Sequence, residues 1–174
     1  ILFILYYYMN GIFEMYKTVY LGLGTNLGNK LENIKNALDG LRKEFGKPIR
    51  VSSIYESEAW GFKSPDSFLN LVVGYNIILN PSETLDICLS VEKKLGRKEK
   101  TGNDYESRII DIDILFFGDL TINQNNLKIP HPLIKKRLFV LEPLLEICCD
   151  ENILNEYSYF LTKLKSLEKL KKIK

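Results

Sequence analysis

The chain has 174 residues, with 24 lysines and arginines against 22 aspartates and glutamates, and a formal charge of +2. Its hydrophobic content of 45% and charged content of 26% are typical of one globular domain and exclude a chain that is mainly disordered. The near-neutral charge disfavours a general nucleic-acid-binding protein, because such domains carry a marked basic excess. The three cysteines form neither an even disulfide framework nor a zinc motif, so we expect a reducing, cytoplasmic location.

The first nine residues, ILFILYYYM, are wholly apolar, but a membrane-spanning helix needs about 20 such residues. They also lack the basic segment and the small-residue cleavage site of a secretory signal. We therefore predict that residues 1–14 are a disordered extension and that residues 15–174 form a single domain. A membrane anchor is the alternative for this extension, but we expect no membrane partner.

Hydrophobic periodicity predicts the element order β-α-β-β-α-β. The β-rich runs are Thr18–Leu23, Val51–Ser57, Phe68–Leu79 and Ile109–Phe117. Apolar side chains recur at helical spacing from Leu31 to Phe45, and Pro81 begins a second helix that Gly96 follows. This order matches a ferredoxin-like α+β fold, an antiparallel sheet with both helices on one face. Residues 118–160 are expected to add strands or turns around it.

The segment from Lys163 to Lys174 contains six lysines and one glutamate. Its leucines, together with Leu161, recur every three residues, which predicts a basic, amphipathic C-terminal helix. Basic faces are common on surface helices, so we interpret this segment as a solvated helix. Membrane or RNA binding is the alternative.

Asp111 and Asp113 stand two residues apart in the strand predicted at Ile109–Phe117. On a strand they share one face, about 7 Å apart, while the isoleucines between and around them point the other way. Two such carboxylates repel each other unless a cation lies between them, and their hard oxygens suit Mg²⁺. The aliphatic opposite face indicates a buried central strand. A solvated strand face opposite lysine or arginine is the alternative.

Basic residues surround the aspartate pair in the sequence. Those before or at the start of the strand are Arg97, Lys98, Lys100 and Arg108, and those after it are Lys128, Lys135, Lys136 and Arg137. Arginine and lysine next to a Mg²⁺ site are suited to binding a polyphosphate. The only histidine, His131, lies between two prolines that fix it, so it is a candidate to hydrogen-bond the ligand; a core or surface role is the alternative.

The first predicted strand ends in a stretch with three glycines, but they do not complete a dinucleotide-binding motif. Leu27 stands where the third glycine of that motif would be, and no phosphate-binding loop lysine follows. We predict that Gly22, Gly24 and Gly28 serve a tight turn between the strand and the helix.

Six short motifs, taken in their order and spacing, resemble the 6-hydroxymethyl-7,8-dihydropterin pyrophosphokinase family of folate biosynthesis. They are GTNLG at 24–28, FLN at 68–70, LGR at 95–97, SRIIDIDI at 107–114, PHP at 130–132 and RLFVLEPL at 137–144. The resemblance covers roughly Val19–Ile147 and implies a ferredoxin-like core. It also implies an ATP-dependent diphosphokinase that transfers pyrophosphate from ATP to the hydroxymethyl oxygen of the pterin and releases AMP.

The resemblance further implies the site residues. Asp111 and Asp113 would bind two Mg²⁺ ions that bridge the phosphates, and Arg97 and Arg108 would offset phosphate charge during the transfer. The remaining nucleotide contacts would come from Glu92, Lys98, Lys100, Ile114, His131 and Arg137. The pterin would contact Ser57, Ala59, Trp60, Phe68, Asn70, Tyr105 and Phe139, with two phenylalanines stacked on its ring. The expected partners are ATP and the pterin, without nucleic acid, and we expect a monomer.

The sequence departs from the family pattern in places. The loop between Arg97 and Arg108 is one residue longer than in some members, Tyr105 replaces a common tryptophan, and Pro132 follows the histidine where some members carry tyrosine. None of these changes removes a metal ligand. Two other functions stay open: a nucleotide-binding regulator without activity, and a nucleotidyltransferase that would release pyrophosphate rather than AMP.

Overall fold

The structure is a computed structural model that describes residues 16–97 and 107–173, so the extension predicted for residues 1–14 lies outside the described residues. The elements in chain order are β1 (Lys17–Thr25), α2 (Lys30–Phe45), β2 (Arg50–Val51), β3 (Ile54–Ser57), β4 (Phe68–Ile77), α3 (Pro81–Lys94), β5 (Asp111–Phe117), β6 (Ile122–Asn123), β7 (Lys128–Ile129), a 3-10 turn (Ile134–Lys136), α4 (Leu138–Ile147), α5 (Glu151–Lys165) and β8 (Lys171–Ile173).

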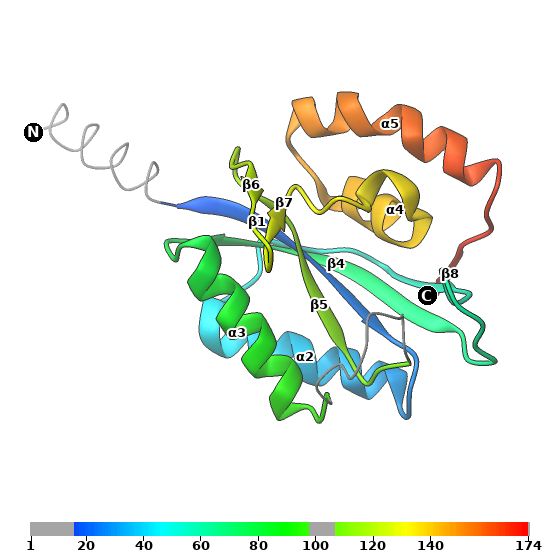
Figure 1. Ribbon diagram of the computed structural model, residues 1–174, viewed down its shortest axis with the longest axis horizontal. Coiled ribbons are helices and arrows are strands. Elements are labelled where there is room, and N and C mark those ends of the chain that lie inside the picture. Colours follow the sequence, from blue (N-terminus) through cyan, green and yellow to red (C-terminus); the bar gives the residue numbers. More distant parts are fainter. Residues whose placement is uncertain (1–15, 98–106, 174) are drawn as a thin grey trace, which may run out of the picture.

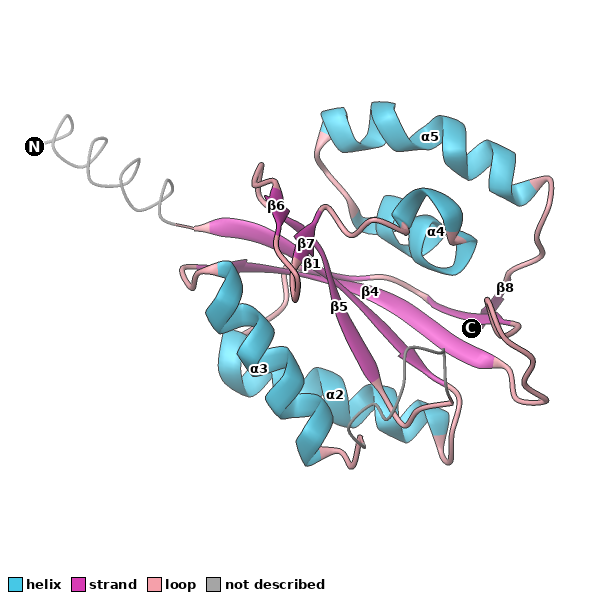
Figure 2. Cartoon of the chain, viewed as in Figure 1, coloured by secondary structure: helices cyan, strands magenta, loops and turns pink. Residues whose placement is uncertain are grey.

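An antiparallel sheet forms the middle layer of the molecule. Its strands run in the order β5-β1-β4-β3-β8, and the short β2 also pairs with β4. Helices α2 and α3 cover one face, whereas α4 and α5 cover the other (Figures 1 and 2). The first six predicted elements thus form the ferredoxin-like α+β core that the sequence predicts, and the later helices add a third layer.

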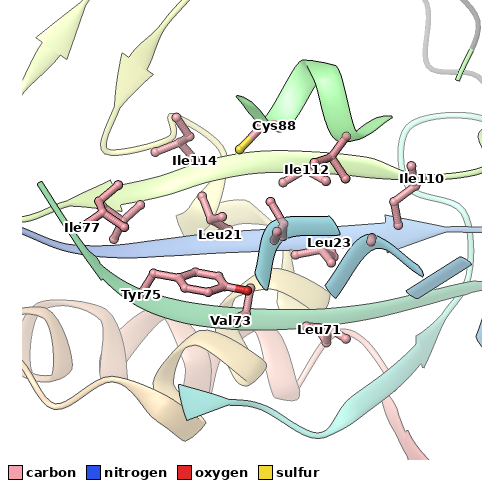
Figure 3. Close-up of a cluster of buried hydrophobic side chains, with 14 of the residues drawn as sticks. Leu21, Leu23, Leu71, Val73, Tyr75, Ile77, Cys88, Ile110, Ile112 and Ile114 are labelled. Atoms are coloured by element: carbon pink, nitrogen blue, oxygen red, sulfur yellow. The ribbon is translucent and has the colours of Figure 1, made fainter. Parts of the chain in front are cut away.

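The two faces of the sheet bury two separate apolar clusters. Side chains such as Leu21 of β1, Val73 of β4 and Ile112 of β5 point toward α2 and α3 (Figure 3). Tyr20 and Val72, each next in sequence to one of these residues, point to the α4 and α5 side. This division follows from the alternation of side chains along a strand.

Local signals in the sequence explain where the helices begin. The Asn80 side chain accepts hydrogen bonds from the first backbone N–H groups of α3, Glu83 bonds back to the Asn80 N–H, and Pro81 occupies the first turn. Asn29 caps α2 through the N–H of Glu32, after a turn in which Gly28 has a φ of +62°.

The structure corrects three expectations from the sequence. β5 lies at the edge of the sheet, not at its centre, and its aliphatic face is buried because α3 packs on it. Residues 138–147 are helical although only strands or turns were expected there; Pro143 and a nearly all-apolar sequence hide the helical period of α4. The C-terminal helix ends at Lys165, and Lys171–Ile173 instead form a strand, because β3 offers an edge to pair with.

Within the described residues, no helix combines the length and the apolar character needed to cross a membrane.

Glu146 joins α4 to the sheet through a network of hydrogen bonds. Its carboxylate accepts from the backbone N–H and hydroxyl of Ser53 at 3.1 and 2.7 Å, from the Tyr55 hydroxyl at 2.9 Å and from Lys172 Nζ at 3.0 Å. Burial alone would raise the pKa of Glu146, but these donors outweigh it and lower the pKa from 4.5 to about 2.

We expect this network to make stability sensitive to acid. A carboxylate with a lowered pKa contributes stability above its unfolded value of 4.5, and this contribution is lost as the pH falls toward 2. Denaturant unfolding from pH 6 down to about pH 2.5 should therefore show a steeper loss of unfolding free energy for the wild type than for Glu146→Gln. Parallel curves for the two proteins would contradict the role of this carboxylate.

Candidate functional site

Two adjoining pockets meet at the aspartate pair of β5. One, the aromatic pocket, is lined by residues that include Gly22, Gly24, Ser57, Trp60, Phe62, Phe68, Asn70 and Phe139. The other, the basic groove, is lined by residues that include Glu92, Lys93, Arg97, Asn126, His131 and Leu133. Four residues line both: Arg108, Asp111, Asp113 and Arg137. The two carboxylates and two arginines therefore form a wall that the pockets share.

The aspartates lie at this wall because of the strand register. Asp111 stands opposite Gly24 of β1 and Asp113 stands opposite Gly22. Asp111 is paired with Arg108 and with Arg97, whose Nη1 lies 2.6 Å from Oδ1. Burial and the neighbouring Asp111 raise the pKa of Asp113 to about 6. A divalent cation would relieve this unfavourable pairing of carboxylates.

The donor set fits Mg²⁺. Among the described residues there is no group of three or more His, Cys, Asp or Glu side chains that could hold a metal. Mg²⁺ does not require one, because it is usually bound by one or two carboxylates and completes its shell with waters and substrate phosphates. Two aspartates beside a basic groove are such a site.

Glu92 supports the groove from α3. Only 2% of the residue is exposed, and its carboxylate accepts a 2.6 Å hydrogen bond from the backbone N–H of Ile112, between the two aspartates. It is also ion-paired with Arg97. Burial raises the pKa of Glu92 to about 7, although the Arg97 charge opposes this change. Glu92 thus fixes both the aspartate strand and one arginine.

His131 lies in the basic groove as a neutral side chain. Burial, followed by the charge of Arg137, lowers its pKa to about 4. Its Nδ1 accepts a hydrogen bond from the Leu133 N–H at 3.2 Å, so the neutral ring carries its proton on Nε2. Ile114 is buried and lines an adjoining depression together with His131.

The aromatic pocket combines ring faces with a few polar groups. The Arg137 guanidinium is 4.7 Å from the Trp60 ring centroid and 5.8 Å from that of Phe139, and the residue is almost fully buried. Asn70 donates a 3.0 Å hydrogen bond to the Ser57 hydroxyl. Such a pocket suits a flat heteroaromatic ring with polar edges.

The structure brings most of the predicted site residues to these pockets. Ala59 is next to Trp60 but is not among the lining residues. Lys98, Lys100 and Tyr105 lie outside the described residues. Arg137, expected near the nucleotide, also reaches the aromatic pocket.

The sequence analysis missed part of the site. Gly22 and Gly24 lie inside β1 and line the aromatic pocket, so the expectation that they form the turn is wrong; only Gly28 does. A Cβ on Gly24 would approach Asn70 Oδ1 to 3.2 Å. Glycine inside a strand signals such a close approach, and that signal was available in the sequence. Phe62, whose ring meets Phe68 edge-on at 6.0 Å, carried no comparable signal.

Asn26 is a further residue whose role the sequence did not reveal. It is 3% exposed, and its Oδ1 accepts a 2.7 Å hydrogen bond from the backbone N–H of Arg108. Its Nδ2 donates to the Ser107 hydroxyl at 2.8 Å, and its own N–H donates to the Arg108 carbonyl at 3.2 Å. Asn26 therefore fixes the backbone from which Arg108 reaches the shared wall.

Replacing Asn26 by alanine should misplace Arg108. We expect the affinity of the basic groove for a polyphosphate to fall about tenfold, because a lost buried hydrogen-bond pair is worth roughly 1–2 kcal/mol. Calorimetric titration with inorganic tripolyphosphate in the presence of Mg²⁺ would measure this affinity. Asn36→Ala, on the exposed side of α2, is the matched control and should behave as wild type. Equal values for both variants would contradict the role of Asn26.

The fold is α+β, and the site is suited to a polyphosphate next to a flat aromatic ligand. Residues 20–149 match the family described as 7,8-dihydro-6-hydroxymethylpterin-pyrophosphokinase. The 2-amino-4-hydroxy-6-hydroxymethyldihydropteridine pyrophosphokinase of Aquifex aeolicus is 45% identical over 130 residues, which are 75% of this chain and 79% of that protein. The Bacillus subtilis enzyme is 36% identical over 135 residues, 77% of this chain and 80% of that protein. The chain belongs to the 7,8-dihydro-6-hydroxymethylpterin pyrophosphokinase family.

Solved structures agree with this fold. A Plasmodium falciparum HPPK-DHPS crystal structure superposes with a TM-score of 0.68 at 20% identity, over 87% of this chain. A crystal structure of HPPK-DHPS in complex with substrates gives a TM-score of 0.66 at 17% identity. The chain spans 44% of the length of either protein. Both likenesses support the fold, whereas the family assignment rests on the closer sequence relatives.

The family assignment confirms the resemblance predicted from the sequence. The chain is an ATP-dependent diphosphokinase of folate biosynthesis, and enzymes of this family transfer pyrophosphate from ATP to hydroxymethyldihydropterin. They use ATP and, in general, Mg²⁺.

Proposed function

We propose that this chain carries out the transfer at the wall shared by its two pockets, with Asp111 and Asp113 as the ligands of two Mg²⁺ ions. One observation carries the proposal: both carboxylates line the aromatic pocket and the basic groove at once. A chemical group can be transferred between two substrates only if both are bound next to the same residues. The aspartate pair is the part of the site that meets this need.

ATP would occupy the basic groove. Arg97 and Arg108, now paired with Asp111, would turn to phosphate oxygens once metal and nucleotide arrive, since both arginines lie within reach of the aspartates. Arg137 supplies a third buried positive charge at the same wall. The neutral His131 offers its Nε2–H as a hydrogen-bond donor to the nucleotide. Lys98 and Lys100 are predicted to add positive charge to this group.

The pterin would occupy the aromatic pocket. Phe68, Phe139 and Trp60 offer ring faces, and Asn70 with Ser57 offers polar groups that can pair with the edge of the pterin ring. Gly24 has no side chain, so the pterin would lie directly against the backbone of β1. We extend the pterin site to Ala59 and Tyr105 on the family resemblance alone.

Positioning and charge stabilisation account for the reaction. Bound Mg²⁺ would neutralise charge on the phosphates and help the hydroxymethyl group to act as a nucleophile. The chain itself aligns the hydroxymethyl oxygen with the β-phosphorus by fixing each substrate in its own pocket. Attack forms the bond from that oxygen to the β-phosphorus and breaks the bond between the β-phosphorus and the oxygen that bridges it to the α-phosphorus, so AMP leaves. The hydroxyl proton passes to solvent. The arginines stabilise the negative charge that the transfer redistributes.

One assay tests this function against its alternatives. The full chain is incubated with ATP, Mg²⁺ and 6-hydroxymethyl-7,8-dihydropterin, and the products are identified by chromatography. We expect AMP and the pterin diphosphate in equal amounts, and no AMP without the pterin. Release of pyrophosphate would favour a nucleotidyltransferase, and ATP binding without product would favour a regulator.

We also propose a monomer in the cytoplasm, without nucleic-acid or membrane partners. All three cysteines are free thiols, which supports a reducing compartment. Sedimentation and cell fractionation are the direct tests.

A further inference from the structure

The strand β8 covers the outer edge of β3 and lies beyond residues 20–149, the part that matches the family. It pairs antiparallel with β3, with Lys172 opposite Tyr55 and Lys171 opposite Glu56. In Figure 1 the chain descends from the end of α5 along the side of the molecule to reach this edge. β8 therefore brings residues from the end of the described chain next to the strand that ends at Ser57 of the aromatic pocket.

The two lysines of β8 reach different elements. Lys172 Nζ lies 3.0 Å from Glu146 Oε1 on α4 and 5.8 Å from the ring centroid of Tyr55. Lys171 Nζ lies 3.2 Å from Glu56 Oε2 on β3. Successive side chains of a strand point to opposite faces, which is why one lysine contacts the helix and the other contacts its paired strand.

Further hydrogen bonds connect both contacts to residues of the aromatic pocket or next to it. Glu56 accepts a 2.8 Å hydrogen bond from the hydroxyl of Ser67, the residue directly before Phe68. Lys30 of α2 donates hydrogen bonds from Nζ to the same hydroxyl at 2.9 Å and to the Ser67 carbonyl at 3.0 Å. Glu56 and Ser67, the residues directly before Ser57 and Phe68 of the pocket, are thus connected to Lys171 of β8.

Glu146 makes the second connection. It lies in α4, the helix that begins at Leu138 and carries Phe139 in its first turn. Through Ser53, Tyr55 and Lys172, Glu146 fixes α4 against β3 and β8. A further groove joins these parts, since Ser57 and Glu58 line both it and the aromatic pocket, and Lys171 lines it as well.

We propose that Lys171 and Lys172 of β8 are positioning residues for the pterin, which hold β3 and α4 at the spacing that the ring needs. The inference rests on the proposed pterin site. Neither lysine lines the aromatic pocket, so they act through Glu56 and Glu146. The basic groove is on the other side of the aspartate wall and does not depend on β8. The two substrates should therefore respond differently when β8 is loosened.

The test is made in the full chain with Lys172→Glu, which places a negative charge against Glu146. We expect the KM for the pterin to rise about fivefold, the upper end of the effect of a partly exposed ion pair. The kcat and the KM for ATP should stay within about twofold of wild type, as expected for lost ground-state binding of one substrate. Lys172→Arg keeps the charge and should restore the wild-type values.

Lys163→Glu is the matched control, because it makes the same change of charge at an exposed position of α5. It should leave the pterin KM unchanged. Equal pterin KM values for Lys172→Glu and Lys163→Glu would overturn the proposal. Equal losses for both substrates would also overturn it, since β8 would then support the whole fold rather than the pterin site.

A second measurement separates this inference from the proposed function. Pterin binding is titrated without turnover by fluorescence, in wild type, Lys172→Glu and Lys163→Glu, together with the unfolding midpoint. Weaker pterin binding only in Lys172→Glu supports the inference even if no pyrophosphate is transferred. A lower unfolding midpoint with unchanged pterin binding overturns it. Absence of pterin binding in the wild type overturns both.

Discussion

Asp113→Asn should lower the turnover of pyrophosphate transfer about a thousandfold, because the carboxylate that the substitution removes lies at the wall that the two pockets share. Asp113 is the cleaner of the two aspartates to test. Asp111 is paired with Arg97 and Arg108, whereas no ion pair of Asp113 occurs in the part of the chain that the structure describes. Its loss should therefore remove a proposed metal ligand without freeing an arginine. Initial rates of AMP release at increasing Mg²⁺ would measure the effect.

The unfolding midpoint distinguishes this effect from a folding defect. Two neighbouring carboxylates repel each other, so Asp113→Asn should leave the midpoint unchanged or raise it while activity falls. Asp119→Asn, in the exposed turn after β5, is the matched control and should keep full activity. Full turnover by Asp113→Asn at saturating Mg²⁺ would contradict the assignment of this aspartate as a metal ligand.

Arg108→Ala is expected to lower kcat about a hundredfold and to change the KM for the pterin by less than about threefold. Arg108 lines both pockets, and its backbone is fixed by Asn26, so its side chain is positioned at the wall that the pockets share. Single-turnover and steady-state kinetics together separate the chemical step from substrate binding. The kcat of Arg108→Lys should lie between the values for wild type and Arg108→Ala, since lysine keeps the charge but loses the planar, two-donor geometry.

Arg50→Ala provides the control for a changed overall charge. Arg50 is exposed in β2, away from both pockets, and its loss should leave kcat unchanged. If Arg108→Ala instead raised the KM for the pterin and kept kcat, Arg108 would act in ground-state binding. That result would require a different account of charge stabilisation at the shared wall.

The sequence predicted the core of the fold because its local signals agree with its tertiary structure. Capping residues such as Asn80, the period of apolar residues in α2 and the alternating strands all indicate the same βαββαβ order. The outer layer was harder to predict. α4 is apolar on nearly every side and contains Pro143, and the ending of α5 depends on the free edge of β3, which is a property of the folded sheet.

In the candidate site, too, features with a local sequence signal could be predicted and features that depend on the folded structure could not. The aspartate pair could be predicted because two carboxylates in a strand conflict with strand stability, and such conflicts mark functional positions. The roles of Asn26 and Glu146 could not be predicted, because each depends on contacts between residues about 80 or more positions apart. Gly22 and Gly24 were misinterpreted because a turn and a ligand contact both favour glycine.

Because Gly22 and Gly24 have no side chains, the backbone of β1 itself lines the aromatic pocket, and this has a consequence for inhibitor design. A compound that lies against this stretch would touch main-chain atoms, which no point mutation can remove. Resistance would require a side chain at Gly22 or Gly24, both of which line the aromatic pocket, and a Cβ at Gly24 would also come within 3.2 Å of Asn70 Oδ1. A side chain that excluded such a compound would therefore also narrow the pocket proposed for the pterin. Compounds that depend on the side chains of Phe62 or Trp60 would lack this protection.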